Sequence, residues 1–158
     1  MTDNGKRIAD SAVTLGVLMG PQDTNGLGNV HGGVIMKLVD EAGGLCAMRH
    51  AGNPVVTVAI DSMTFIEPIR VGMFVQFKAE LTFVGRTSME ARVEVIAEHP
   101  LKGTSQVTNI AYLVYVALGK DGRPTPAPTI TYDTDDQRKR AELGKARQAR
   151  RKQEQARE

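Results

Sequence analysis

The chain contains few of the residues that form covalent cross-links and aromatic cores. Among its 158 residues there is one cysteine, Cys46, and no tryptophan, and aromatic residues make up 4% of the total. A single cysteine cannot form an internal disulfide, which suits a reducing cytoplasm. The core must therefore be built mainly from Val, Ile, Leu, Met and Ala.

Long apolar segments are also missing. The N-terminal segment from Met1 to Asp10 is polar and has no apolar stretch of the signal-peptide type. No run approaches the roughly 18 to 20 apolar residues that a membrane-spanning helix needs. We therefore expect a cytoplasmic protein that neither enters a membrane nor is exported.

Motifs for metal and nucleotide chemistry are absent from the sequence. Three scattered histidines and one cysteine have no metal-ligand spacing. There is no Gly-x-Ser-x-Gly nucleophile elbow, no P-loop and no dinucleotide fingerprint. The apolar segment around Cys46 is expected to raise the pKa of the thiol, which argues against a cysteine nucleophile. We expect no metal site and no metal or redox cofactor.

The net charge of +2 is unevenly distributed along the chain. From Gln137 to the end there are nine Lys or Arg and three Glu, a net charge of +6, which leaves about −4 on the preceding residues. The basic residues therefore belong to a tail, and we expect no nucleic-acid binding by the folded body. We divide the chain into one domain over residues 1–136 and a charged tail over 137–158. The tail is expected to be helical or disordered, with no face to bury.

Hydrophobic patterning predicts one strand, a glycine-rich loop, one long helix and four further strands. From Val34 to His50, apolar residues recur at three- and four-residue steps, as one helix face requires. The last strand is apolar on both faces, so it should be buried on both sides or lie at an interface. The other predicted segments are a strand at Ser11–Met19, a loop at Asp23–Gly33, and strands at Val55–Ile66, Phe74–Phe83, Ser88–Ala97 and Val107–Leu118. This order predicts an α+β fold in which an antiparallel sheet wraps around a single helix.

Asp40 is a carboxylate inside the apolar helix. It shares one side of that helix with Met36 and with Gly43 and Gly44. Each glycine lowers helix propensity by about 1 kcal/mol relative to alanine, so we expect the helix to pack closely against backbone there. One interpretation is that Asp40 pairs with Lys37 or points to solvent. The other is that it acts as a general base or nucleophile in a dry cleft.

The segment Gly28–Gly33 places glycines and an asparagine directly before the helix. Free backbone amides at a helix N-terminus favour developing negative charge, so they can form an oxyanion hole. Alternatively, the glycines only permit a tight turn and Asn29 is a helix cap. An amide-rich helix start and an acid about two turns further along can face one ligand, so the combination is more specific than either feature alone.

Three segments resemble the cytosolic acyl-coenzyme A hydrolases of the hotdog superfamily. They are GNVHGGVIMKLVDEAGGLCAMR (Gly28–Arg49), VVTVAIDSMTFIEPIRVG (Val55–Gly72) and VGRTSM (Val84–Met89). The resemblance covers roughly residues 15–128, with the segments in the expected order and spacing. It implies the hotdog fold, which agrees with the elements predicted above.

The resemblance implies catalytic roles for three residues. Asp40 matches the carboxylate that activates water or attacks the thioester, and Asn29 matches the active-site loop amide. The backbone N–H of Gly33 would polarise the thioester carbonyl. Substrate-binding roles are expected for His31, Gly32, Thr57, Arg86, Thr87 and Ser88.

Two of these assignments have structural alternatives. The Arg86–Ser88 segment matches a region near the nucleotide end of coenzyme A, where an arginine pairs with phosphate, but it also fits an ordinary hairpin exit. His31 stands where other members carry an aromatic residue. It either lines the thioester pocket or makes a hydrogen bond within the loop.

The resemblance also implies an assembly and an activity. In this family the loop and the acid of one site come from different protomers, so Asn29 of one chain would face Asp40 of its neighbour. We expect a homodimer as the minimal active unit, within a hexamer built as a trimer of dimers. The expected activity is hydrolysis of an acyl-coenzyme A thioester to free fatty acid and coenzyme A, with no separate cofactor. Two alternatives stay open: a hotdog hydratase acting on enoyl or hydroxyacyl thioesters, and a non-catalytic acyl-coenzyme A-binding regulatory module.

Overall fold

The structure is a computed structural model that describes residues 5–158. Its main strands are β2 (Val13–Leu18), β3 (Val55–Met63), β4 (Phe74–Val84), β5 (Ser88–His99) and β6 (Thr104–Ala117). The long helices are α2 (Gly32–Ala51) and α3 (Asp135–Gln155). The short elements are β1 (Lys6–Arg7), α1 (Ile8–Ser11), the 3-10 helix η1 (Pro21–Asp23) and β7 (Ile130–Thr131).

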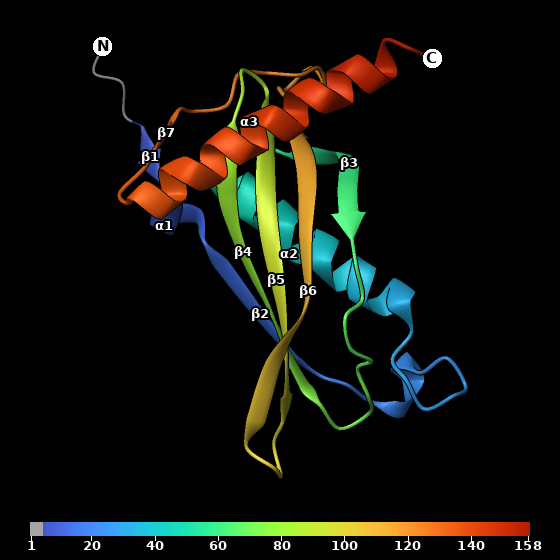
Figure 1. The fold of residues 1–158 in the computed structure, drawn as a ribbon. Coiled ribbons are helices and arrows are strands. Elements are labelled where there is room, and N and C mark those ends of the chain that lie inside the picture. Colours follow the sequence, from blue (N-terminus) through green and yellow to red (C-terminus); the bar gives the residue numbers. More distant parts are fainter. Residues whose placement is uncertain (1–4) are drawn as a thin grey trace.

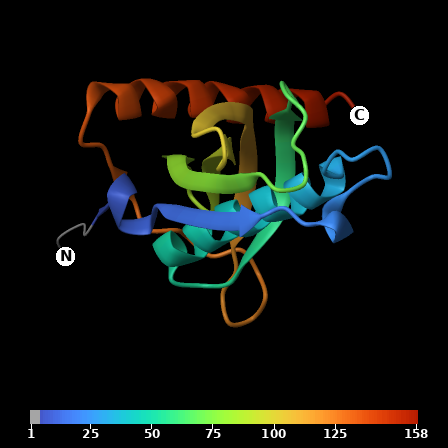
Figure 2. The ribbon, with the colours of Figure 1, turned by 90° about the horizontal axis from the view of Figure 1, so that it is seen from below.

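The five main strands form one antiparallel sheet in the order β2-β4-β5-β6-β3. Helix α2 lies along one face of the sheet and α3 lies across the other, so the sheet is the middle of three layers (Figure 1, Figure 2). The predicted hairpin is present as β4 and β5, which pair from Phe74 opposite Glu98 to Val84 opposite Met89. The predicted α+β fold, with an antiparallel sheet around one long helix, is confirmed.

Helix α2 forms where the apolar periodicity predicted it. Ile35, Val39, Ala42 and Cys46 recur at steps of three or four residues, and all four are buried against the sheet. Full burial of one such aliphatic side chain contributes about 1.5–3 kcal/mol to the stability of the fold. The apolar face of the helix therefore packs against the sheet. The helix ends at Gly52, whose φ of +66° is a left-handed conformation that favours glycine.

The N-terminal strand and the segment that precedes α3 meet beside the C-terminus of α2. Strands β1 and β7 pair in parallel, with Lys6 opposite Ile130. The ammonium group of Lys6 donates a hydrogen bond to the carbonyl oxygen of His50 at 2.7 Å. A cation at this position interacts favourably with the negative end of the helix dipole. In the part of the chain that is described, no helix is long and apolar enough to cross a membrane.

Strand β6 is covered on both faces, as its apolar sequence predicted. Leu113 and Tyr115 face α2 and are almost fully buried, while Val114 on the opposite face is 5% exposed. The cover on that second face comes from α3, because the guanidinium group of Arg147 lies 3.8 Å from the centre of the Tyr112 ring.

The expectation that the basic tail has no face to bury is wrong. Residues 135–155 form α3, capped by Thr134, and the helix packs on the sheet through Ala141 and Gly144. A Cβ at Gly144 would lie 3.0 Å from Cβ of Phe83 and 2.9 Å from Oε1 of Glu90, so the helix and sheet approach closely at this point.

Ion pairs hold α3 over the polar face of the sheet. Arg147 donates two hydrogen bonds to the Glu90 carboxylate, at 2.9 and 2.7 Å, and Glu90 is only 2% exposed. Arg151 pairs with Asp61 of β3 at one end of the helix. The tail was expected to be solvated because its residues are charged, but these strand carboxylates face the charged helix rather than water. A charged sequence alone does not show whether its partners are water molecules or carboxylates of the sheet.

Candidate active site

Asp40 lies on α2 and is held by side chains from two strands. The hydroxyl group of Thr57, on β3, donates a hydrogen bond to Asp40 Oδ1 at 2.8 Å. The hydroxyl group of Tyr115, on β6, lies 3.0 Å from the same oxygen and 3.1 Å from the Asp40 backbone carbonyl. Lys37 lies 3.9 Å from Glu41 instead, so the expected alternative of a Lys37 pair for Asp40 is not realised.

Tyr115 is fixed by close packing against α2. A Cβ added at Gly43 would lie 2.5 Å from the Tyr115 hydroxyl oxygen, so any larger residue would displace the tyrosine or the helix. The sequence predicted a close approach at Gly43 and Gly44, but the partner is this side chain rather than backbone. Burial, and then the nearby charge of Asp40, raise the pKa of Tyr115 well above its ordinary value. Its hydroxyl therefore stays protonated at neutral pH and acts as a hydrogen-bond donor.

The arrangement gives Asp40 a fixed orientation and one free oxygen. Thr57 and Tyr115 both bond to Oδ1, and Oδ2 has no hydrogen-bond partner within residues 5–158. An oriented carboxylate with one uncommitted oxygen can accept a proton from water or attack an electrophilic carbon.

Asn29 lies in a second group of residues at the start of α2. A cavity of about 330 Å³ is lined by the loop from Asn25, the helix start at Gly32 and the segment Phe65–Ile69. Asn29 lines this cavity, and its buried Oδ1 has no hydrogen-bond partner among the described residues. A buried polar atom without a partner costs about 1–3 kcal/mol, which a ligand or a neighbouring protein surface would recover.

The N-terminus of α2 is capped by His31. The backbone N–H of Gly33 donates a hydrogen bond to His31 Nδ1 at 3.0 Å. The Gly33 N–H, which the family resemblance assigns to the thioester carbonyl, is thus bonded to the His31 ring. His31 makes the local hydrogen bond that was one of its two expected roles. Gly32, the first residue of α2, lines the cavity together with Asn29. Its backbone N–H has no hydrogen-bond acceptor in residues 5–158.

Arg86, Thr87 and Ser88 line a third region on the opposite face of the sheet. They surround a cavity of about 390 Å³ together with Val58 and Ala59 of β3 and the last two turns of α3. The amide of Gln148, on α3, donates a hydrogen bond to Ser88 Oγ at 3.0 Å. The segment is thus a hairpin exit that also borders a cavity.

Within one chain, the predicted site residues form three groups rather than one. Asp40 and Thr57 are joined by a hydrogen bond, Asn29 and Gly32 share a cavity at the helix start, and Arg86–Ser88 lie beyond the sheet. Eight residues of α2 separate Gly32 from Asp40, a rise of about 12 Å. A single ligand can contact the first two groups in one chain only by spanning that distance.

Sequence reasoning missed Tyr115 and the residues of α3. The signal for Tyr115 was its position in an otherwise aliphatic strand, together with two glycines in the facing helix. The signal for α3 was the spacing of Arg140, Arg147 and Arg151, which lie on one helix face at steps of seven and four residues. Across residues 5–158, no group of three His, Cys, Asp or Glu side chains is placed to hold a metal ion.

Comparisons with known proteins identify relatives by sequence and by fold. Residues 27–104 match the family described as the thioesterase superfamily. The cytosolic acyl coenzyme A thioester hydrolase of Rattus norvegicus is 40% identical over 133 residues, which cover 82% of this chain. The chain spans about a third of the length of that relative, 35%.

Solved structures match over almost the whole chain. An apo-hexameric acyl-CoA thioesterase is 34% identical with a TM-score of 0.90, and the match covers 96% of this chain and 98% of that one. An acyl-CoA hydrolase from Staphylococcus aureus, in complex with butyryl coenzyme A and coenzyme A, is 30% identical with a TM-score of 0.88. That match covers 96% of this chain and 92% of the other. By fold and by sequence, the chain belongs to the acyl-CoA thioester hydrolases of the hotdog thioesterase superfamily.

Proposed function

We propose that the protein hydrolyses acyl-coenzyme A thioesters to free fatty acid and coenzyme A, with Asp40 as the catalytic carboxylate. The observation that carries the proposal is the Asp40 carboxylate, held through Oδ1 by Thr57 and Tyr115 with Oδ2 free. Membership of the family supports the same reaction. Solved structures of the Staphylococcus aureus hydrolase include variants in which an aspartate, an asparagine or a threonine is replaced by alanine. These are the residue types of Asp40, Asn29 and Thr57.

In the proposed reaction, Asp40 acts as a general base. Oδ2 accepts a proton from a water molecule while the water oxygen bonds to the thioester carbon, and the carbonyl electron pair moves to the oxygen. Collapse of this tetrahedral intermediate breaks the carbon–sulfur bond, and the departing thiolate takes the proton back from Asp40. Thr57 and Tyr115 are positioning residues, because they contact Asp40. The reaction needs no metal or redox cofactor, and coenzyme A is part of the substrate and product.

The start of α2 is proposed to stabilise the oxyanion. The free N–H of Gly32 and the side chain of Asn29 border the same cavity, at the positive end of the helix dipole. The N–H of Gly33 becomes a further donor when the exposed His31 ring rotates away from it. Asn29 and Asp40 lie in separate groups within one chain, so we propose that one active site combines Asn29 from one protomer with Asp40 from another.

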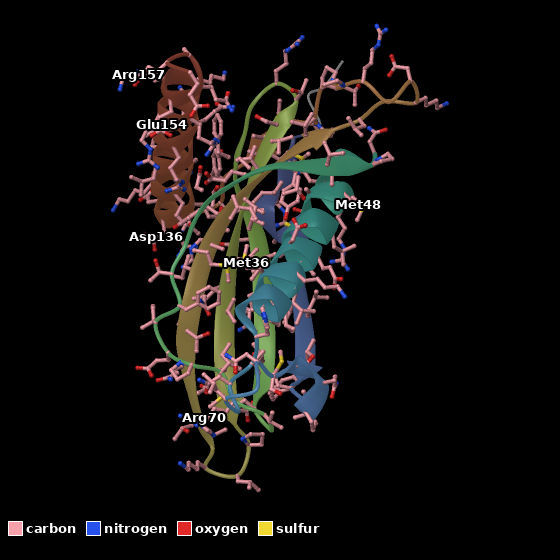
Figure 3. All side chains as sticks on the ribbon, turned by 90° about the vertical axis from the view of Figure 1, so that its right-hand side faces the viewer. Met36, Met48, Arg70, Asp136, Glu154 and Arg157 are labelled. Atoms are coloured by element: carbon pink, nitrogen blue, oxygen red, sulfur yellow. The ribbon has the colours of Figure 1, made fainter. Side chains whose placement is uncertain are left out.

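A homodimer formed along β3 would bring these groups together. β3 is an edge strand, and its residues Val56, Val58 and Ile60 are between 42% and 54% exposed. Met36 and Met48 on α2, labelled in Figure 3, are each 42% exposed. A second copy would cover this apolar surface and pair with the open strand edge. The hexameric thioesterase among the solved structures supports a trimer of such dimers, and the name of the rat relative supports a cytosolic location.

Release of free thiol from acyl-coenzyme A tests the proposed activity. The assay is run on acyl chains from acetyl to palmitoyl, with wild type, Asp40→Asn and the control Glu41→Gln, an exposed acid on the same helix. Loss of a general base lowers turnover by about 100- to 10,000-fold, so Asp40→Asn should be nearly inactive while the control is not. Thermal stabilisation by coenzyme A should persist in Asp40→Asn. An Asp40→Asn variant with turnover within a few-fold of wild type would exclude the role.

Two further measurements separate the alternatives. Co-expressed Asn29→Ala and Asp40→Asn chains should regain part of the activity if the site is shared, and purified mixed dimers that stay inactive would exclude sharing. The hydratase alternative needs a free histidine beside the acid, whereas Nδ1 of His31 accepts a hydrogen bond from the Gly33 N–H. An absorbance change of an enoyl thioester without thiol release would favour that alternative. Binding of acyl-coenzyme A without either reaction would favour the regulatory module.

A further inference from the structure

The cavity of about 330 Å³ at the start of α2 combines polar groups with an apolar wall. Asn29 and Gly32 border it with the amide groups that are proposed to bind the oxyanion. The rest of its lining is mainly apolar and includes Ile35 and Phe65. Among the described residues that line it, none is Lys, Arg or His, and the one charged residue is Glu67. The cavity therefore suits the neutral acyl end of an acyl-coenzyme A and not its phosphate groups.

The ring of Phe65 lies against the first residue of α2. A Cβ added at Gly32 would lie 3.5 Å from Cζ of Phe65 and 3.9 Å from Cε1, so the far edge of the ring points at Gly32. The backbone nitrogen and the Cβ position of a residue are separated by the Cα atom alone. An oxygen that accepts a hydrogen bond from the Gly32 N–H at about 2.9 Å therefore lies close to the ring. The first carbon of the acyl chain, bonded to the same carbonyl carbon as that oxygen, then comes within contact range of Phe65.

Two hydrogen bonds fix the backbone on either side of Phe65. The side-chain amide of Asn109, on β6, donates a hydrogen bond to the Thr64 carbonyl oxygen at 2.7 Å. The backbone N–H of Ile66 donates one to the Thr108 carbonyl oxygen at 3.0 Å. Asn109 is fully buried, so water does not compete for its bond. The Phe65 side chain is 48% exposed in the single chain, so it is anchored through its backbone and leaves apolar surface that a ligand can cover.

We propose that Phe65 is a specificity-determining residue, which selects straight-chain acyl groups over groups branched at the carbon next to the carbonyl. This inference rests on the proposed function and narrows its substrate class. A branch at this carbon adds a methyl group where the ring edge and the first turn of α2 already meet. The branched group must then displace the anchored ring or move its carbonyl oxygen away from the Gly32 N–H. Either change weakens the transition state more than it weakens the binding of coenzyme A.

Two isomeric substrates test the role of Phe65. Butyryl- and isobutyryl-coenzyme A differ only in the branch, so the ratio of their kcat/KM values measures the discrimination. One methylene-sized group in an apolar pocket changes such a ratio by about 10- to 200-fold. Phe65→Ala should lower the preference for butyryl at least about tenfold, and Phe65→Leu, which keeps a smaller apolar side chain, should lower it less. The control is Val71→Ala, at an exposed position of the same connection that is outside the described cavity lining, and it should keep the wild-type ratio.

Ligand binding separates a failure of this inference from a failure of the proposed activity. The ketone analogues of the two substrates, in which a methylene group replaces the sulfur atom, cannot release thiol. They are titrated by calorimetry into wild type, Phe65→Leu and Phe65→Ala, and the preference for the straight analogue should fall in that order. Thiol release with the same isomer ratio in wild type and both variants would overturn the inference and leave the proposed activity in place. A Phe65-dependent preference between the analogues, in a protein that releases no thiol, would overturn the proposed activity and leave the acyl site in place.

Discussion

Replacement of two adjacent glycines should have opposite effects on stability. Alanine at either position of α2 adds about 1 kcal/mol of helix propensity. At Gly44 the new Cβ would lie 3.6 Å from Cε1 of Tyr115, an ordinary contact, so Gly44→Ala should be neutral or stabilising by up to that amount. At Gly43 it would lie 2.5 Å from the Tyr115 hydroxyl oxygen, and something must move.

The cost at Gly43 follows from what the tyrosine loses. Overpacking of a core costs about 1–3 kcal/mol, and displacing the hydroxyl breaks a hydrogen bond to the Asp40 carboxylate that is worth about 1.5–3 kcal/mol. After the propensity gain, Gly43→Ala should be about 1.5–5 kcal/mol less stable than wild type. Turnover should fall as it does in Tyr115→Phe, because both changes remove the same donor from Asp40.

A double-mutant cycle tests the cause. Tyr115→Phe removes the atom that clashes, and the remaining ring carbons lie 3.2 Å from the added Cβ. Gly43→Ala should therefore cost at least about 1 kcal/mol less in the Tyr115→Phe background than alone. Urea denaturation at one fixed protein concentration gives the four free energies of unfolding. If Gly43→Ala proves as stable as Gly44→Ala, or if the two changes simply add, the packing argument is refuted.

Three other predictions concern the sheet, the core and the strand edge. Glu90→Gln should lower the free energy of unfolding by about 3 kcal/mol and speed hydrogen exchange in residues 135–155, because it leaves the Arg147 guanidinium without its carboxylate, whereas the exposed Glu142→Gln should do neither. Burial raises the pKa of the Cys46 thiol from 9.0 to about 11, so the unfolded chain ionises first and stability is lost as pH rises from about 9 to 11. Cys46→Ala should lose less stability than wild type over that pH range in pH-dependent denaturation, because the buried tyrosines still contribute, and an identical pH profile would contradict the assignment. Val56→Asp should dissociate the proposed dimer in analytical ultracentrifugation, and an unchanged sedimentation coefficient would place the interface elsewhere.

The sequence predicted those elements that bury one apolar face. Helix α2 and strands β4 and β5 each have a single periodicity, of three to four residues or of two, and each was located within about two residues of its ends. The same method failed for α3, because the polar face of β5 at Glu90 and Arg92 has the pattern of a solvent-exposed surface. In the structure this face lies under Arg147, so its polar residues form an ion-paired layer and not a hydrated one. The periodicity of apolar residues shows which face of a strand or helix is polar, but it does not show whether water or another helix covers that face.

The candidate site was predictable only in part, for a related reason. Asp40 was recognisable because a carboxylate on an apolar helix face is costly without a partner. Its partners come from positions 17 and 75 residues further along the chain, and no local pattern indicates which residues of distant strands will meet. Thr57 entered the prediction through the family resemblance, and Tyr115 did not enter it at all.

The bulge in β3 explains why one short segment serves both sides of the sheet. Thr57 pairs with Tyr115 and Ala59 with Val114, so Val58 is one residue more than the partner strand requires. Tyr115 points toward α2 and Val114 toward α3, so Thr57 bonds to Asp40, whereas Val58 and Ala59 both line the cavity beside α3. Without the extra residue, strict alternation would turn Ala59 back toward α2 and reverse the side chains up to the second register shift, between Ile60 and Met63. Positions 55–60 are apolar apart from Thr57, so nothing in the sequence marks the extra residue, although the direction of Ala59 depends on it.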